Sequence, residues 1–177
     1  SVLPKPIAER LKEGQHTIAD SFSEVTVLFA DIVNFTKLAA HRSPIEVVSL
    51  LNTIFSAFDW LSQHHGVEKI KTIGDSYMVV GGLPKPQLNH AEAIAEMALD
   101  MLDEIARFNT QTGESLSMRM GINTGPVVAG VIGTNKFIYD LWGDTVNLAS
   151  RMESHGIAGS IQVTAETYNL LRDKYIF

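Results

Sequence analysis

The chain has 177 residues, of which 45% are hydrophobic and 19% charged, a composition typical of one globular domain. Asp and Glu outnumber Lys and Arg by 20 to 14, and the formal charge of −6 disfavours binding to nucleic acid through its phosphates. The absence of cysteine excludes disulfides, thiolate metal ligands and a thiol nucleophile. No apolar run approaches the roughly 18 residues of a bilayer span, so we expect no membrane segment in this chain.

Residues 1–22 are expected to form a linker with a short helix. Pro4 and Pro6 precede apolar residues at helical spacing, and Glu13-Gly14 ends the pattern. Two interpretations stay open for this segment: a lead-in without function, and the end of a helix arriving from an upstream partner domain. Residues 23–177 are expected to form a single domain.

The first half of that domain predicts a strand, a helix and a hairpin. Val25–Ile32 is a nearly continuous apolar run, as in a central strand buried on both faces, and Asp31 stands at its carboxyl end. From Ser43-Pro44 to His65, apolar residues recur every three or four positions, which predicts a long core helix ended by Gly66. The runs Val67–Ile73 and Ser76–Gly81 flank Gly74-Asp75, which predicts a tight hairpin.

The second half predicts a further core helix, several strands and two short helices. The expected elements are a helix over Ala91–Phe108, strands over Leu116–Ile122, Val127–Ile132 and Phe137–Leu141, a helix over Asp144–Met152, a strand over Ile161–Val163 and a last helix capped by Thr164. Glycines between the strands mark points where the backbone turns or approaches a neighbour closely. The element order predicts an α+β fold, a ferredoxin-like βαββαβ sheet with helices packed on one face.

Two acidic residues stand where strands end. Asp31 follows the first strand and Asp75 lies at the tip of the hairpin. If the hairpin lies beside the first strand, both carboxylates reach the same edge of the sheet, where oxygen ligands suit Mg²⁺ or Mn²⁺ rather than zinc. The backbone from Ile32 to Thr36, at the start of a helix, could face phosphate oxygens. Taken singly, each aspartate is also explained as a helix cap or as turn chemistry.

Four blocks of sequence in this order resemble the class III nucleotide cyclases, the catalytic domain shared by adenylate and guanylate cyclases. They are FADIVNFT (29–36), EKIKTIGDSYMVVGG (68–82), MRMGINTGPVVAGVIG (118–133) and YDLWGDTVNLASRME (139–153). The resemblance runs from about Val25 to the end of the chain. It implies a class III cyclase homology domain that acts as a homodimer, with two composite sites between antiparallel domains.

The resemblance also assigns roles to individual residues. Asp31, Asp75 and the Ile32 carbonyl match the ligands of two Mg²⁺ or Mn²⁺ ions. Arg119 matches an arginine that contacts the triphosphate, and Asn147 and Arg151 match the pair that holds the ribose and stabilises the pentavalent α-phosphate. The turn formed by Val33, Asn34, Phe35 and Thr36 lies near the phosphates, and Lys71 and Asp140 match the two positions that contact the base. The metal ligands would come from one protomer, and Lys71, Asp140, Asn147 and Arg151 from the other.

Hydrogen-bonding chemistry favours ATP over GTP at the Lys71 and Asp140 positions. Adenine presents an acceptor at N1 and a donor at N6, which complement an ammonium and a carboxylate respectively. Guanine presents a donor at N1 and an acceptor at O6, so both contacts would be repulsive. The open alternative is that Lys71 and Asp140 form a purely structural ion pair.

The predicted function is therefore an adenylate cyclase that makes 3′,5′-cyclic AMP and pyrophosphate from ATP. Alternatives are a guanylate cyclase and a non-catalytic nucleotide-binding dimerisation module. Two departures from the family are Asn34, in place of a glycine often found there, and the end of the chain at Phe177, before a hairpin whose lysine binds the terminal phosphates. We expect an upstream regulatory domain and a cytoplasmic location, as a cytoplasmic protein or as the cytoplasmic part of a larger, membrane-tethered one.

Overall fold

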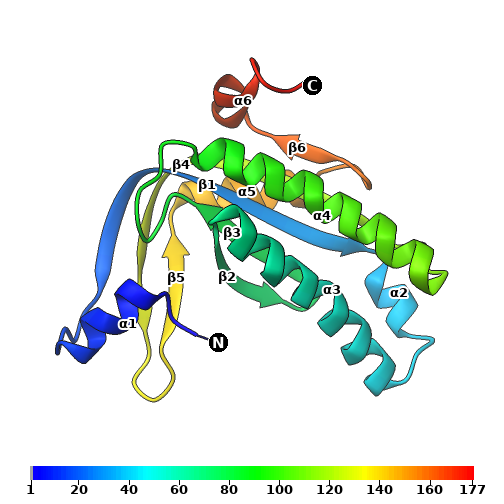
Figure 1. The fold of residues 1–177 in the computed structure, drawn as a ribbon, viewed down its shortest axis with the longest axis horizontal. Helices are drawn as coiled ribbons and strands as arrows, with labels where there is room; N and C mark the ends of the chain where they lie inside the picture. The colour runs from blue at the N-terminus through cyan, green and yellow to red at the C-terminus, as the bar shows by residue number, and fades with distance from the viewer. Residues whose placement is uncertain (1) are drawn as a thin grey trace.

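The computed structural model describes residues 2–177, which fold around one twisted β-sheet (Figure 1). The strand order is β2-β3-β1-β4-β5; β6 pairs with β4 in parallel, and the other pairs are antiparallel. The strands are β1 (Ala19–Val33), β2 (Glu68–Ile73), β3 (Ser76–Gly81), β4 (Ser117–Ile132), β5 (Ile138–Trp142) and β6 (Ile161–Val163). The helices are α1 (Lys5–Lys12), α2 (Phe35–Ala39), α3 (Pro44–His65), α4 (His90–Thr112), α5 (Asp144–Ser154) and α6 (Ala165–Leu171).

The predicted α+β fold class is confirmed, and helices cover both faces of the sheet. The two long helices, α3 and α4, pack on one face over Leu28, Ala30 and Ile32, as expected. The expectation of helices on one face alone needs correction, because α1 and α5 pack over Val25, Val27 and Phe29 on the other (Figure 1). Successive side chains of β1 point to opposite faces, and both sets are apolar, so each face requires a covering layer.

Local signals at its two ends fix the limits of α3. The Ser43 hydroxyl accepts a hydrogen bond from the Glu46 backbone N–H at 3.3 Å, and Pro44 occupies the first helical position. Gly66 ends the helix in the left-handed conformation, at φ 66°. By length and composition α3 could cross a membrane, which the sequence analysis did not anticipate. Its buried residues Leu50, Ile54 and Phe58 pack in the core beside the sheet.

Two strands are longer than their apolar patterns indicate. β1 begins at Ala19, since residues 19–22 pair with Val127–Gly130 of β4 although Asp20 and Ser21 are polar. The predicted strands 116–122 and 127–132 are one continuous strand, β4. Gly125, one of the glycines between the expected strands, continues β4 beside a bulge in β1 between Phe22 and Val25.

The lead-in segment contains the predicted short helix, α1, which packs against the sheet. Ile7 of α1 is buried in the core, and Arg10 of the same helix pairs with Asp20 of β1 at 2.6 Å. α1 thereby lies near β5, at one end of the molecule (Figure 1).

The two edges of the sheet approach each other. β2 and β5 stand at opposite ends of the strand order, yet they are in contact. The Lys71 ammonium on β2 donates to the Asp140 carboxylate on β5 at 2.8 Å. Strong twist thus curls the sheet around the face that carries α1 and α5, and the Lys71–Asp140 ion pair joins its two edge strands.

Candidate functional site

The structure brings the two predicted metal-binding aspartates together. Asp31 lies at the end of β1, opposite Ser76 of β3, and Asp75 is the hairpin residue immediately before Ser76. The Ile32 backbone N–H donates to the Asp75 carbonyl oxygen at 3.3 Å, which fixes the hairpin tip beside the end of β1. The hairpin therefore lies beside the first strand, as the predicted metal site requires, and places both aspartates at the same edge of the sheet.

The environment of Asp31 disfavours a bare negative charge. Burial, followed by repulsion from the Asp75 and Glu153 carboxylates, raises the pKa of Asp31 to about 6, although Arg119 opposes the rise. Two carboxylates that destabilise each other in a half-buried position form a favourable environment for a divalent cation. The donor set therefore fits the predicted Mg²⁺ or Mn²⁺.

The protein alone offers few ligands for such an ion. Within residues 2–177, no group of three or more histidine or acidic side chains gathers in a geometry that could hold a metal. Mg²⁺ is commonly bound by one or two carboxylates together with water and substrate phosphates. Asp31 and Asp75 meet that description, with the nearby Ile32 carbonyl as a further oxygen.

Arg119 is held by acidic groups of its own chain. It lies on β4, directly opposite Asp31 of β1. Its Nε donates to Glu153 Oε2 at 2.7 Å, and its Nη2 lies 3.4 Å from Asp31 Oδ2. Glu153 was not anticipated from the sequence, because a buried glutamate near the end of a helix carries no local motif. Its only signal is that its carboxylate needs a buried partner.

The predicted base-reading residues form a direct ion pair. Lys71 and Asp140 are 2.8 Å apart, and the second oxygen of Asp140 accepts the Leu141 backbone N–H, also at 2.8 Å. The Asp140 side chain is 14% exposed and that of Lys71 38%, so the carboxylate is fixed while the ammonium remains accessible. This arrangement satisfies both interpretations that the sequence left open, a structural pair and a pair facing a base.

Asn147 and Arg151 lie one turn apart on α5, and both are exposed. Within the described part of the chain, neither side chain forms a hydrogen bond or an ion pair with another residue. Arg151 is therefore not paired with a neighbouring glutamate among residues 2–177. An amide and a guanidinium on one accessible helix face can contact one ligand together.

The turn after Asp31 has the geometry expected of its sequence. Asn34 adopts φ 63°, the left-handed conformation that asparagine tolerates better than other non-glycine residues. Phe35 and Thr36 begin the short helix α2, and Phe35 is buried. Asn34 thus adopts a backbone conformation that also favours glycine.

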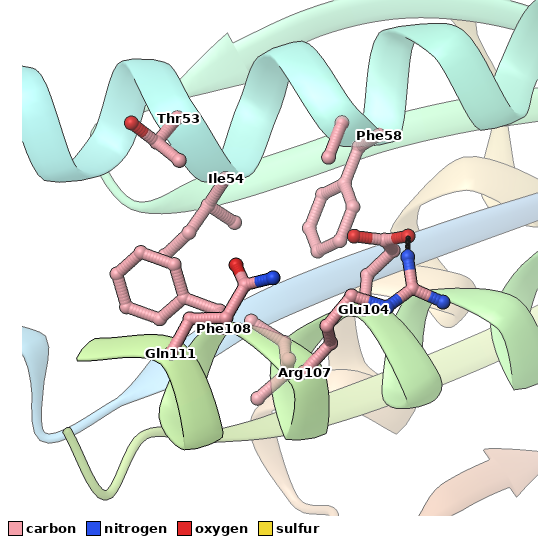
Figure 2. Close-up of a pocket in the computed structure, with 9 residues that line it drawn as sticks. Thr53, Ile54, Phe58, Glu104, Arg107, Phe108 and Gln111 are labelled. Atoms are coloured by element: carbon pink, nitrogen blue, oxygen red, sulfur yellow. Dashed lines mark hydrogen bonds and ion pairs between the residues drawn. The ribbon is translucent and has the colours of Figure 1, made fainter. Parts of the chain in front are cut away.

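Two cavities differ in whether they can hold a nucleotide base. The pocket between α3 and α4 has a volume of about 60 Å³ and is lined by Ile54, Phe58, Glu104 and Phe108 (Figure 2). This is well below the roughly 300 Å³ of a small-molecule site. A cavity of about 780 Å³ lies beside β2 and β5, and Lys71 and Tyr139 are among its lining residues. This cavity is large enough for a base, and it is lined by Lys71 of the Lys71–Asp140 pair.

Comparison with known proteins identifies one family. Residues 17–177 match the family described as the adenylate and guanylate cyclase catalytic domain. An adenylate cyclase of Mycobacterium tuberculosis is 50% identical over 177 residues, covering 99% of this chain and 40% of that protein. The guanylate cyclase soluble subunit beta-2 of Rattus norvegicus is 45% identical over 175 residues, covering 98% of this chain and 26% of that protein.

A solved structure shows the same fold. The guanylate cyclase domain of a protein from Catenaria anguillulae, in complex with GTP, aligns with a TM-score of 0.85 at 41% identity. The alignment covers 89% of this chain and 86% of that domain. The chain spans two fifths or less of the length of these two curated relatives. One of them is named an adenylate cyclase and the other a guanylate cyclase.

Proposed function

The chain belongs to the family of adenylate and guanylate cyclase catalytic domains, and on that premise we propose that it is an adenylate cyclase. The 3′-oxygen of ATP attacks its own α-phosphorus, the bond from that phosphorus to the bridging oxygen breaks, and pyrophosphate leaves. The products are 3′,5′-cyclic AMP and pyrophosphate. Because the nucleophile belongs to the substrate, the protein has to bend the nucleotide and stabilise the charge that develops at the α-phosphate.

The chain's own residues meet these demands from three places, which are α5, the end of β1 and the turn between β2 and β3. Arg151 carries a fixed positive charge on an exposed helix face, where it stabilises the pentavalent α-phosphate. Asn147, one turn earlier, orients the ribose. Asp31 and Asp75, with the Ile32 carbonyl, would hold two Mg²⁺ or Mn²⁺ ions. When bound, these ions lower the pKa of the 3′-hydroxyl and neutralise the phosphates.

The Lys71–Asp140 ion pair is the single observation that carries the choice of ATP. N1 and the N6 amino group are neighbours on one edge of adenine, so a donor and an acceptor 2.8 Å apart match that edge. Guanine reverses both groups, and the two mismatched contacts cost roughly a few kcal/mol. Guanylate cyclase is the second candidate function, because a guanylate cyclase is 45% identical to this chain.

A homodimer is part of this proposal. Asn147 and Arg151 are exposed and unpaired within the described chain, which suits groups that complete a site on a second copy. The hairpin of β4 and β5 exposes apolar side chains that a partner would cover, namely Val128, Ile132, Phe137, Ile138 and Trp142. We also propose a cytoplasmic location, where ATP is available, and an upstream regulatory domain connected through α1.

Paired assays with ATP and GTP test the proposal. Purified protein is incubated with each nucleotide in Mg²⁺ or Mn²⁺, and both cyclic products are quantified. We expect cyclic AMP to dominate and Asp75→Ala to abolish turnover without unfolding the chain. Dominant cyclic GMP would establish the second candidate. If neither cyclic nucleotide forms although nucleotide binding is intact, the chain is a non-catalytic binding module.

Exchange of the base-reading pair gives the first prediction. Lys71→Glu combined with Asp140→Asn presents an acceptor to guanine N1–H and a donor to O6. We expect the ratio of kcat/KM for ATP to that for GTP to fall at least 100-fold, corresponding to roughly 3 kcal/mol. Steady-state kinetics with both nucleotides measure this ratio. An unchanged ratio would show that Lys71 and Asp140 form only a structural pair.

A further inference from the structure

Arg119 connects two parts of the chain that the reaction uses differently. One arm of its guanidinium lies 3.4 Å from Asp31, and its Nε donates to Glu153 of α5 at 2.7 Å. Its side chain is 30% exposed, whereas those of Asp31 and Glu153 are 20% and 10% exposed. Both carboxylates are therefore largely withdrawn from water, and Arg119 is the cation that they share.

The contact between β4 and the end of α5 is tight around this arginine. A Cβ placed on Gly121 would lie 2.2 Å from the Glu153 backbone nitrogen, so the helix backbone rests directly on the strand. Beside it, a Cβ on Gly156 would lie 3.2 Å from Arg119 Cγ, so the arginine stem is enclosed as well. A change in the position of Arg119 is therefore transmitted both to Asp31 and to α5.

These two connections serve different reaction centres if the sites are composite, which rests on the proposed function. In a homodimer, Asp31 of one chain would work with Asn147 and Arg151 of the other. The Asp31 and the α5 that one Arg119 contacts would then belong to two different centres. One Arg119 side chain would therefore contact a part of each of the two reaction centres.

We propose that Arg119 is a positioning residue that orients the metal-binding Asp31 for one composite site and, through Glu153, orients α5 for the other. This role differs from the triphosphate contact that the family resemblance implies. Arginine suits it because its planar group presents donors in two directions at once, which a lysine ammonium on a flexible stem does not reproduce.

Hybrid dimers with a single working site separate the two roles. One chain carries Arg151→Ala and supplies Asp31; its differently tagged partner carries Asp31→Ala and supplies Arg151. Arg119→Gln is added to one chain or to the other, and doubly tagged dimers are purified. With the variant beside the working Asp31, we expect two quantities to rise about 10- to 100-fold: the Kd for Mn²⁺, measured without turnover by electron paramagnetic resonance, and the Mn²⁺ concentration for half-maximal activity.

With Arg119→Gln in the chain that supplies Arg151, we expect a kcat at least 10-fold lower at saturating Mn²⁺, without a change in metal dependence. Glu153→Gln should reproduce this effect in the same chain. Arg107→Gln, which removes an exposed arginine of α4, is the matched control and should leave both constants unchanged in either chain.

The outcomes distinguish this inference from the proposed function. If the hybrid with intact Arg119 is inactive although it assembles, the composite site fails, and this inference fails with it. If that hybrid is active but Arg119→Gln acts from one chain only, Arg119 does not serve both sites and the inference is wrong. If Arg119→Gln raises the KM for ATP without changing metal dependence or kcat, the positioning role is wrong and a direct phosphate contact is established.

Discussion

At the scale of single residues, two buried tyrosines have opposite hydrogen-bonding situations. The Tyr77 hydroxyl donates to Asp59 at 2.7 Å, whereas the buried Tyr139 hydroxyl finds no partner among the described residues. Since an unsatisfied buried hydroxyl costs about 1–3 kcal/mol, we expect Tyr139→Phe to raise the free energy of unfolding by about 1 kcal/mol. Tyr77→Phe, the matched control, should lower it by a similar amount. Urea denaturation measures both, and a destabilised Tyr139→Phe would show that this hydroxyl has a partner in solution.

Glu68 makes stability depend on pH. Burial raises the pKa of Glu68 to about 7 from an ordinary value near 4.5. The folded chain therefore holds this proton more tightly than the unfolded chain, so its stabilising effect is complete below pH 4.5 and is lost as the pH rises to 7. Because solvent partly screens a half-buried group, we expect a loss of roughly 1–2 kcal/mol.

Glu68→Gln isolates this effect. The glutamine does not titrate, so the variant should be more stable than the parent at pH 8, and this advantage should shrink towards pH 5. Urea denaturation at several pH values gives the difference between the two proteins, in which the other titrating groups cancel. A constant difference across this range would contradict the assignment.

At the scale of elements, the contact between α5 and β4 depends on Gly121. A side chain there would meet backbone atoms of Ala149 and Glu153, which cannot rotate away. We expect Gly121→Ala to push α5 off the strand, to destabilise the fold by about 3 kcal/mol and to reduce turnover, because α5 carries Asn147 and Arg151. Thermal unfolding and cyclase assays measure the two effects. Full stability with unchanged activity would show that the helix moves without consequence.

The sequence predicted those elements whose apolar period is strong. α3 was expected to run from Pro44 to His65, and the hairpin of β2 and β3 was expected from Gly74-Asp75; both are confirmed. The first residues of β1 were missed because Asp20 and Ser21 are polar and give no apolar signal. Their strand conformation comes from pairing with β4, which a local pattern does not contain.

The candidate site, too, could be predicted only in part from the sequence. Asp31 and Asp75 could be brought together from two strand ends and a hairpin tip. Glu153 could not be identified, because its partner Arg119 is 34 positions away along the chain and on another element. The direct pairing of Lys71 with Asp140 depends on the curl of the whole sheet, which no single segment encodes.

At the scale of the whole molecule, the exposed apolar hairpin predicts how the chain associates. Phe137 and Trp142 are both about two-fifths exposed, on a hairpin that projects from the body of the sheet (Figure 1). We expect Phe137→Glu with Trp142→Glu to raise the dimer dissociation constant at least 100-fold and to reduce activity at low protein concentration. Leu88→Glu, which changes another exposed apolar residue in the loop before α4, should change neither.

Analytical ultracentrifugation and activity at several protein concentrations measure this prediction. If the hybrid-dimer scheme is correct, the lost activity should return as the concentration of the variant is increased. A fully active monomer of the double variant would contradict the composite site.

The curl of the sheet also restricts how this domain could change its nucleotide during evolution. The two residues that would discriminate the purines are the same two that join β2 to β5. A lineage that altered one of them first would pass through an intermediate with an unmatched charge where the sheet edges meet. That intermediate would be less stable before it preferred the other nucleotide. Divergence between the two substrates is therefore expected to proceed by paired replacements, or after a prior gain in stability elsewhere in the domain.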